Sequence, residues 1–161
     1  MKKCFFIGHR ECPDELYLEM LQAIERCISE FDVREFIVGR YGKFDHLAAK
    51  CVKEGKKKYP HIALTMLLPY LPVERRIDTP KGFDGSLHPE GLESVPKRLA
   101  IVRANRYAVD HADVLIAYVW HTASNARNLL EYAEKKAERS GLQMIRIGSG
   151  GQNEKHAANQ S

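Results

Sequence analysis

Residues 36–50 read FIVGRYGKFDHLAAK, and this stretch decides the fold. Its apolar start predicts a buried strand, a turn with Gly39 and Gly42 follows, and an amphipathic helix begins near Asp45. This order can direct free backbone N–H groups at an anion, and an acid suits the first turn of a helix. A glycine turn after a strand is as often a plain turn as a ligand site, so its meaning depends on the other strands.

The same alternation of apolar runs and amphipathic segments continues on both sides of this stretch. The strands are expected at residues 4–7, 36–38, 62–68, 113–120 and 144–147, and the helices at 13–30, 44–59, 96–111 and 125–140, with Gly141 as the last C-cap. Near-continuous apolar strands that alternate with helices predict an α/β fold. We therefore expect a Rossmann-like, open, mostly parallel five-stranded sheet with helices on both faces.

Length and composition limit the organisation of the chain. Its 161 residues, 44% of them hydrophobic, suit one domain, which we place at residues 1–147. Residues 148–161 are rich in Gly, Asn, Gln and Ser and are expected to be a disordered tail. Residues 73–95, rich in proline and glycine, interrupt the alternation and predict a long surface connection, the kind of loop that commonly carries function.

Charge and residue usage indicate the class of partner. The net charge of +4 fits an anionic ligand, and the lack of a basic stripe interleaved with aromatic residues argues against nucleic acid. No apolar run approaches the roughly 20 residues that a membrane span needs, so we expect no membrane contact. Four scattered cysteines without a C-x-x-C pair predict reduced thiols in a cytoplasmic protein. The histidines do not have zinc-site spacing, and we expect neither a metal nor a cofactor.

Polar residues and glycines cluster where the predicted strands end. The candidate ligand-binding residues there are Gly8, His9, Arg10, Gly39, Arg40, Gly42, Lys43, Phe44, Asp45, Pro69, Tyr70, His121, Ser124 and Asn125. In an open parallel sheet the ligand crevice lies outside the carboxyl ends of the strands, at the point where the strand order reverses. Each turn alone reads equally as a surface turn, but four that converge favour a binding site. The dinucleotide fingerprint G-x-G-x-x-G is absent.

Taken together, the motifs resemble a known family. They are IGHR (residues 7–10), VGRYGKFD (38–45), LLPY (67–70), FDGSLHPEGLESVPKRLAIVRANRY (83–107), DHADVLIAYVWH (110–121) and LLEYAEKK (129–136). Over about residues 3–147 the chain resembles the SLOG superfamily, which includes LOG proteins and the DNA-processing protein DprA, and within it the YpsA-like branch of bacterial and phage proteins. The resemblance implies a Rossmann-like fold that binds nucleotides or nucleotide derivatives, and it makes a homo-oligomer plausible.

The sequence departs from the family pattern at two places. The family's turn H-x-x-Gly-Gly-Ala here ends in Ser124 and Asn125, whose side chains restrict close backbone approach. The family's Arg-Asn-x-x-Met helix motif here has Ala104 at the arginine position, Asn105 at the asparagine and Ala108 at the methionine. Asn105 therefore joins the candidate ligand-binding residues. Arg103 and Arg106 flank the motif but point about 100° away on the helix.

These departures bear on whether the protein is an enzyme. LOG-type phosphoribohydrolases cleave nucleoside monophosphates and use an arginine and a PGGxGTxxE motif, of which only the glutamate spacing survives here, at Glu131. Glu131 is the candidate catalytic residue of that hypothesis, but its position favours a capping or first-turn acid of a helix.

Three hypotheses follow from the sequence. The main one is a sensor, sequestering or regulatory module that binds a nucleotide or nucleotide derivative: His9 and Arg10 meet phosphate, Asp45 contacts ribose or caps the helix, and Tyr70 stacks on a base. The second is a nucleotide N-glycosidic hydrolase with Glu131 or Asp45 as acid or base. The third is single-stranded DNA binding of the DprA type.

Overall fold

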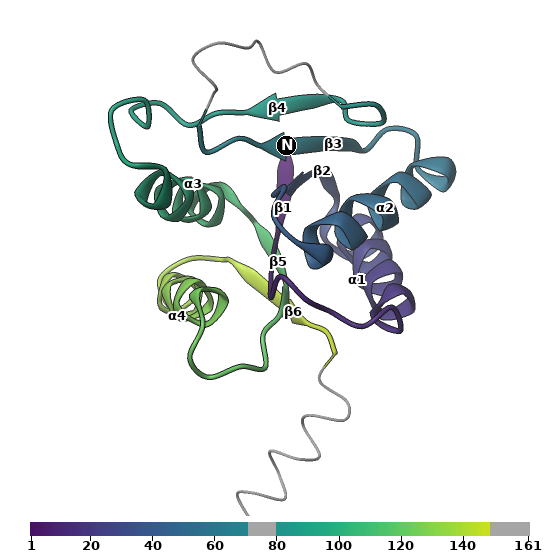
Figure 1. The fold of residues 1–161 in the computed structure, drawn as a ribbon. Coiled ribbons are helices and arrows are strands. Elements are labelled where there is room, and N and C mark those ends of the chain that lie inside the picture. Colours follow the sequence, from purple (N-terminus) through teal and green to yellow (C-terminus); the bar gives the residue numbers. More distant parts are fainter. Residues whose placement is uncertain (71–79, 149–161) are drawn as a thin grey trace, which may run out of the picture.

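The structure is a computed structural model that describes residues 1–70 and 80–148. Its strands are β1 (Lys2–Gly8), β2 (Val33–Val38), β3 (Ala63–Leu67), β4 (Gly85–Leu87), β5 (Val114–Tyr118) and β6 (Gln143–Arg146). Its helices are α1 (Leu16–Phe31), α2 (Lys43–Lys58), α3 (Lys97–His111) and α4 (Asn125–Ala137). Figure 1 shows α1 and α2 on one side of the sheet and α3 and α4 on the other. The predicted α/β, Rossmann-like class is confirmed.

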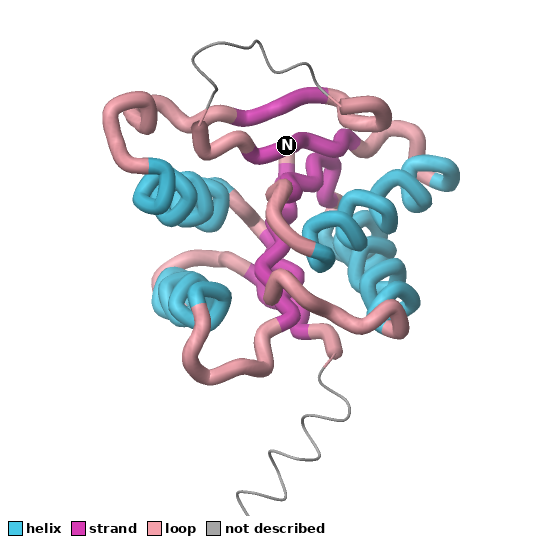
Figure 2. Tube along the Cα trace, in the orientation of Figure 1, coloured by secondary structure: helices cyan, strands magenta, loops and turns pink. Residues whose placement is uncertain are grey.

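The order of the strands indicates where a ligand crevice is expected. The sheet runs β4-β3-β2-β1-β5-β6, and every neighbouring pair is parallel. The chain therefore builds outward from β1 in one direction and then returns to build outward in the other. In Figure 2 the helices flank the strands on both sides, as such a doubly wound sheet requires. The order reverses between β1 and β5, so the carboxyl ends of these two strands mark the expected crevice.

Within the described residues the sheet has six strands, which corrects the prediction of five. The additional strand, β4, lies within the segment 73–95 that we expected to be a surface connection, and it pairs with β3 at the edge of the sheet. Asp84 holds it there, because its backbone N donates to Leu64 O and its Oδ2 accepts from Leu64 N, both at 2.8 Å. Three residues, GSL, are too few to show a period, so the sequence did not reveal the strand. Residues 73–79 of that segment lie outside the described residues.

Each face of the sheet supports its own core, because successive side chains of a strand point to opposite faces. Cys4 and Phe6 of β1 pack with α1 and α2, whereas Phe5 and Ile7 pack with α3 and α4. All four side chains are buried. This explains why the strand sequences are apolar throughout rather than alternating. All four cysteines are buried, and within the described residues none forms a disulfide.

Several boundaries differ from the prediction. The first helix begins at Leu16 instead of Pro13, and the second strand begins at Val33 instead of Phe36. Gly141 is not the C-cap of the last helix, which ends at Ala137. Instead, Ser140 makes side-chain hydrogen bonds just after the helix. Its Oγ donates to Lys136 O at 3.0 Å and accepts from Leu142 N.

Gly148, the first residue of the predicted tail, is the last residue that the structure describes. Gly148 is placed by its backbone N, which donates to Glu19 Oε2 at 2.8 Å. The prediction for residues 149–161 lies outside the described residues. None of the helices in residues 1–70 and 80–148 combines the length and the apolar character of a membrane span. In the same ranges, no three His, Cys, Asp or Glu side chains gather to hold a metal ion.

Candidate functional site

A pocket of about 280 Å³ opens at the carboxyl edge of the sheet, beside the point where the strand order reverses. Its floor is β1, and the loops after β1 and β2 and the facing sides of α3 and α4 form its walls. Seven candidate residues from the sequence line it: Gly8, Arg10, Gly39, Asp45, Pro69, Asn105 and Asn125. The fold thus brings together about half of the predicted set, drawn from five separate segments of the chain.

The glycines of this edge are needed for contacts within the protein. A Cβ on Gly42, which has φ of +98°, would lie 2.7 Å from the Cα of Arg10. The loop after β2 presses on the loop after β1 at this point, and Lys43 N donates to Arg10 O at 2.6 Å. A Cβ on Gly8 would clash with the Phe44 ring, so the lack of a side chain at Gly8 makes room for that ring. Gly42 and Gly8 therefore explain how the two loops meet.

Asp45 is the acidic group of the pocket. It lies in the first turn of α2, and Gly42, not Asp45, occupies the N-cap position. Its Oδ2 accepts from Tyr41 N at 3.0 Å, so it fastens the turn across Gly39, whose Cβ would stand 2.7 Å from the same oxygen. Burial raises the pKa of Asp45 to about 6, although the hydrogen bond from Tyr41 N opposes the rise. This carboxyl can therefore gain or lose a proton near neutral pH.

The remaining polar groups of the pocket are basic or neutral. Arg10 is exposed and forms no ion pair within the described chain. Asn105 on α3 and Asn125 at the start of α4 supply carboxamides on the opposite wall. A guanidinium and two carboxamides around an apolar floor are suited to an anion joined to a group with hydrogen-bonding edges.

His9 ties the two strand ends together. Its Nε2 accepts from Trp120 N at 3.0 Å and from His121 N at 3.2 Å, so this nitrogen carries no proton. Burial lowers the pKa of His9, and the nearby His121 lowers it further. His9 does not line the pocket. The contact of His9 with phosphate stays a prediction. In such a contact only Nδ1 of His9 could donate a hydrogen bond to the phosphate, because Nε2 already accepts from the backbone.

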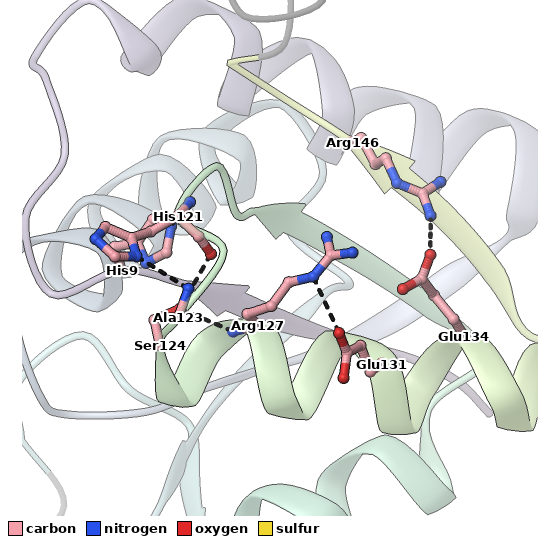
Figure 3. A network of polar contacts seen from close by, with 8 residues as sticks. All are labelled: His9, His121, Ala123, Ser124, Arg127, Glu131, Glu134 and Arg146. Carbon is pink, nitrogen blue, oxygen red and sulfur yellow. Dashed lines mark hydrogen bonds and ion pairs between the residues drawn. The ribbon is translucent and has the colours of Figure 1, made fainter. Parts of the chain in front are cut away.

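The turn before α4 is capped by its own side chains. Ser124 Oγ accepts from Arg127 N at 3.0 Å, and His121 Nδ1 accepts from Ala123 N at 3.1 Å. Figure 3 shows this network, with His9 reaching the same turn from β1. His121 and Ser124 therefore shape the turn and lie outside the lining of the pocket.

Glu131, the candidate catalytic residue, also lies away from the pocket lining. It is exposed and pairs with Arg127 at 3.3 Å between Nε and Oε1. Figure 3 shows the pair beside Glu134 and Arg146 on the side of α4 toward β6. The carboxyl that the structure brings to the pocket is Asp45.

The other candidate residues have different surroundings. Phe44 is buried and stacks on Tyr118, with 6.1 Å between the two ring centroids. Its side chain therefore belongs to the core. Lys43 Nζ pairs with Asp14 at 3.0 Å. Lys97 Nζ lies over the Tyr70 ring, 5.1 Å from the centroid of that ring. Arg40 and Gly42 line a separate hollow of about 470 Å³ on the outer side of the loop after β2, which shares Gly39 and Asp45 with the pocket.

Several pocket residues escaped the sequence analysis. Tyr41 lines the pocket, and burial together with the neighbouring Tyr70 hydroxyl raises its pKa. Ile101, Ala126 and Leu129 form apolar walls from α3 and α4. Tyr41 stands inside the quoted glycine turn and could have been included. The apolar residues read as ordinary core positions, because only the tertiary fold exposes part of them to a pocket.

The chain shows a likeness to a known protein in its structure and not in its sequence. No family model matches the chain, and no curated protein does. Among solved structures, the chain is similar to DNA processing protein A from Helicobacter pylori, a protein with a single-stranded DNA-binding mode, at 14% identity and a TM-score of 0.48. The match covers 83% of this chain and 62% of the other. At this identity the likeness concerns the Rossmann-like fold, and membership of the YpsA-like branch stays a prediction.

This likeness corrects one expectation. The sequence was taken to argue against nucleic acid as a partner, on its mild net charge and lack of a basic, aromatic-interleaved stripe. That expectation is corrected by this comparison, in which the similar solved structure is that of a protein with a single-stranded DNA-binding mode.

Proposed function

We propose that this protein binds a nucleotide or a nucleotide-derived small molecule in the pocket beside the β1–β5 reversal, and that it acts as a sensor, sequestering or regulatory module. The observation that carries the proposal is the lining of that pocket: Arg10, Asn105 and Asn125 converge there over an apolar floor. Arg10 binds the phosphate in this account, because a guanidinium matches phosphate oxygens in charge and geometry. The carboxamides bind sugar or base.

The direct test is mass spectrometry of the small molecules released when freshly purified protein is denatured. We expect a nucleotide from the wild-type protein and at least a tenfold lower yield from Arg10→Ala, since a hydrogen bond to a charged group contributes about 1.5–3 kcal/mol. Arg34→Ala is the matched control, because Arg34 is an exposed arginine at the start of β2 that pairs with Asp32. Equal yields from wild type and Arg10→Ala would contradict the assignment.

A second candidate is hydrolysis of a nucleotide N-glycosidic bond with Asp45 as the acid or base. Its support is that Asp45 lines the pocket and that its pKa of about 6 suits proton transfer near neutral pH. Incubation with nucleoside monophosphates should then release free base. Asp45→Asn should stop the release, whereas Glu131→Gln should leave it intact. Release that continues in Asp45→Asn would eliminate this mechanism.

Single-stranded DNA binding is the third candidate, and one surface feature favours it. Trp120 is 52% exposed at this edge, beside His9 and His121, with ring centroids 5.4 and 5.2 Å from its own. Exposed aromatic rings are stacking platforms for bases. A fluorescently labelled oligonucleotide should then bind with a steep salt dependence, and Trp120→Ala should weaken it severalfold. Binding indifferent to that change would rule out this surface.

A further inference from the structure

A second hollow, which the proposed function does not use, continues the pocket outward between α3 and α4. Its volume is about 760 Å³, and it shares Ile101, Asn105, Asn125 and Leu129 with the pocket. The two hollows are therefore parts of one depression. At about 280 Å³ the inner pocket lies just below the range of about 300–1,000 Å³ that is typical of ligand sites, so it accommodates only part of a nucleotide.

The chemistry of this groove is cationic and amide-rich. Its polar lining is Arg98, Asn105 and Arg106 from α3, and Asn125 and Asn128 from α4. Among the residues that the structure describes, no carboxylate lines it. The α3 positions recur at the helical spacing that places side chains on one face, and the α4 positions do the same. The arrangement presents donors along the whole groove.

Arg106 is held in position for an anion. Its Cζ lies 4.9 Å from the ring centroid of Tyr132, whose hydroxyl donates to Asp110 Oδ1 at 2.7 Å. The ring supports the planar guanidinium by a cation–π contact that leaves its donors free. Across residues 1–70 and 80–148, neither Arg106 nor Arg98 forms an ion pair with a carboxylate.

We propose that the α3–α4 groove is a subsite for the second phosphate of an extended nucleotide, so that the protein selects nucleoside diphosphates and longer phosphate chains over monophosphates. This proposal rests on the proposed function, since it assumes a nucleotide in the inner pocket. Arg10 binds the first phosphate, and Arg106 with Arg98 binds the next. Asn105 and Asn125 line both hollows, so they lie where the inner pocket opens into the groove.

Calorimetric titration with the 5′-monophosphates and 5′-diphosphates of adenosine, guanosine, cytidine and uridine tests the proposal. For the base that binds, we expect the diphosphate to bind at least about tenfold more tightly than the monophosphate. Arg106→Ala should remove this preference while the monophosphate affinity stays within about twofold, and Arg98→Ala should reduce it. Arg103→Ala is the matched control, since Arg103 is an exposed arginine of α3 outside the groove lining, and it should keep the preference.

The outcomes separate the two proposals. Monophosphates that bind as tightly as diphosphates would overturn the subsite and leave the proposed function standing. An equal loss for both ligand classes in Arg106→Ala, or the same loss in Arg103→Ala, would also overturn it, because either result indicates a general charge effect. No binding by any of the eight nucleotides would contradict both proposals.

Discussion

At the scale of single residues, Asp45 combines two conflicting properties. Its carboxylate fastens the turn after β2 through Tyr41 N, yet burial raises its pKa to about 6. A native pKa above the ordinary value of 3.8 means that the folded protein binds the proton more tightly than the unfolded chain. Ionisation of Asp45 therefore lowers the free energy of unfolding progressively as the pH rises from about 4 to about 6. A position that reduces stability beside a pocket is typical of a functional group.

Asp45→Asn should consequently stabilise the protein at pH 7.5, by about 1–2 kcal/mol. The amide oxygen can still accept from Tyr41 N, and the cost of burying a charge disappears. Chemical denaturation at pH 4 and pH 7.5 measures the effect, which should be much smaller at pH 4, where Asp45 is protonated in the native state. Glu131→Gln, at an exposed carboxyl, serves as control. A destabilised Asp45→Asn at pH 7.5 would contradict the assigned environment of this carboxyl.

The second prediction for a single residue concerns the protonation of His9. The fluorescence of Trp120, the single tryptophan of the chain, can report it. Protonation of Nε2 would break the hydrogen bonds from Trp120 N and His121 N. Because the native pKa is lowered, the stability that these bonds contribute is present above the ordinary pKa and is lost as the pH falls through the native value. Trp120 fluorescence should therefore titrate with a midpoint below 6.5.

His9→Ala should abolish that titration, and His61→Ala should preserve it, since His61 contacts Tyr59 at the opposite end of α2. The groups that face His9 are His121, Tyr118 and Trp120. A titration that persists unchanged in His9→Ala would contradict this role of His9.

At the scale of elements, the strand–turn–helix unit from β2 to α2 depends on Gly42. Its φ of +98° is strained for any other residue, and a Cβ would meet the backbone of Arg10. We expect Gly42→Ala to lower the free energy of unfolding by roughly 1–3 kcal/mol, because the new residue pays backbone strain and separates the two loops.

Gly141→Ala is the matched control, since a Cβ there meets nothing within 4 Å and its φ is not positive. Urea unfolding compares the two variants with the wild type. Gly42→Ala that is as stable as Gly141→Ala would show that the loops do not meet as described.

The elements also show what the sequence could predict. Four helices and five strands followed from apolar runs and helical spacing, because their signals are long enough to have a period. β4 did not, since an edge strand of three residues has no pattern of its own and depends on the free edge of β3. Gly141 was assigned as a C-cap on residue type alone, whereas Ser140 closes that end of the chain.

The candidate site was predictable in place and less so in detail. Arg10, Gly39 and Asp45 line the pocket because they follow strands whose carboxyl ends meet at one edge. Sequence reasoning assigned the glycines to a ligand, and the structure shows that Gly8 and Gly42 accommodate protein atoms. His9 and Lys43 carried the expected chemistry, but other parts of the protein engage their side chains. Such pairings depend on which loops meet, and local sequence does not encode that.

At the scale of the whole molecule, the account depends on one property of the topology. The strand order reverses beside β1, so the loops after β1 and β2 and the helices α3 and α4 face one another across a pocket. The inner pocket and the α3–α4 groove together form a depression with three arginines along it and Asp45 at its inner end. A ligand that fits should be anionic and elongated, with its charge along the groove.

The most direct test is a two-dimensional ¹H–¹⁵N spectrum of the isotope-labelled protein, titrated with the eight nucleotides above. The account predicts that the resonances that move are those of the pocket: Gly8, Arg10, Gly39, Tyr41 and the side-chain amides of Asn105 and Asn125. Arg10→Ala should remove the shifts while the rest of the spectrum stays folded. Shifts that concentrate elsewhere, or a spectrum that no nucleotide changes, would contradict the central claim that this pocket binds nucleotides.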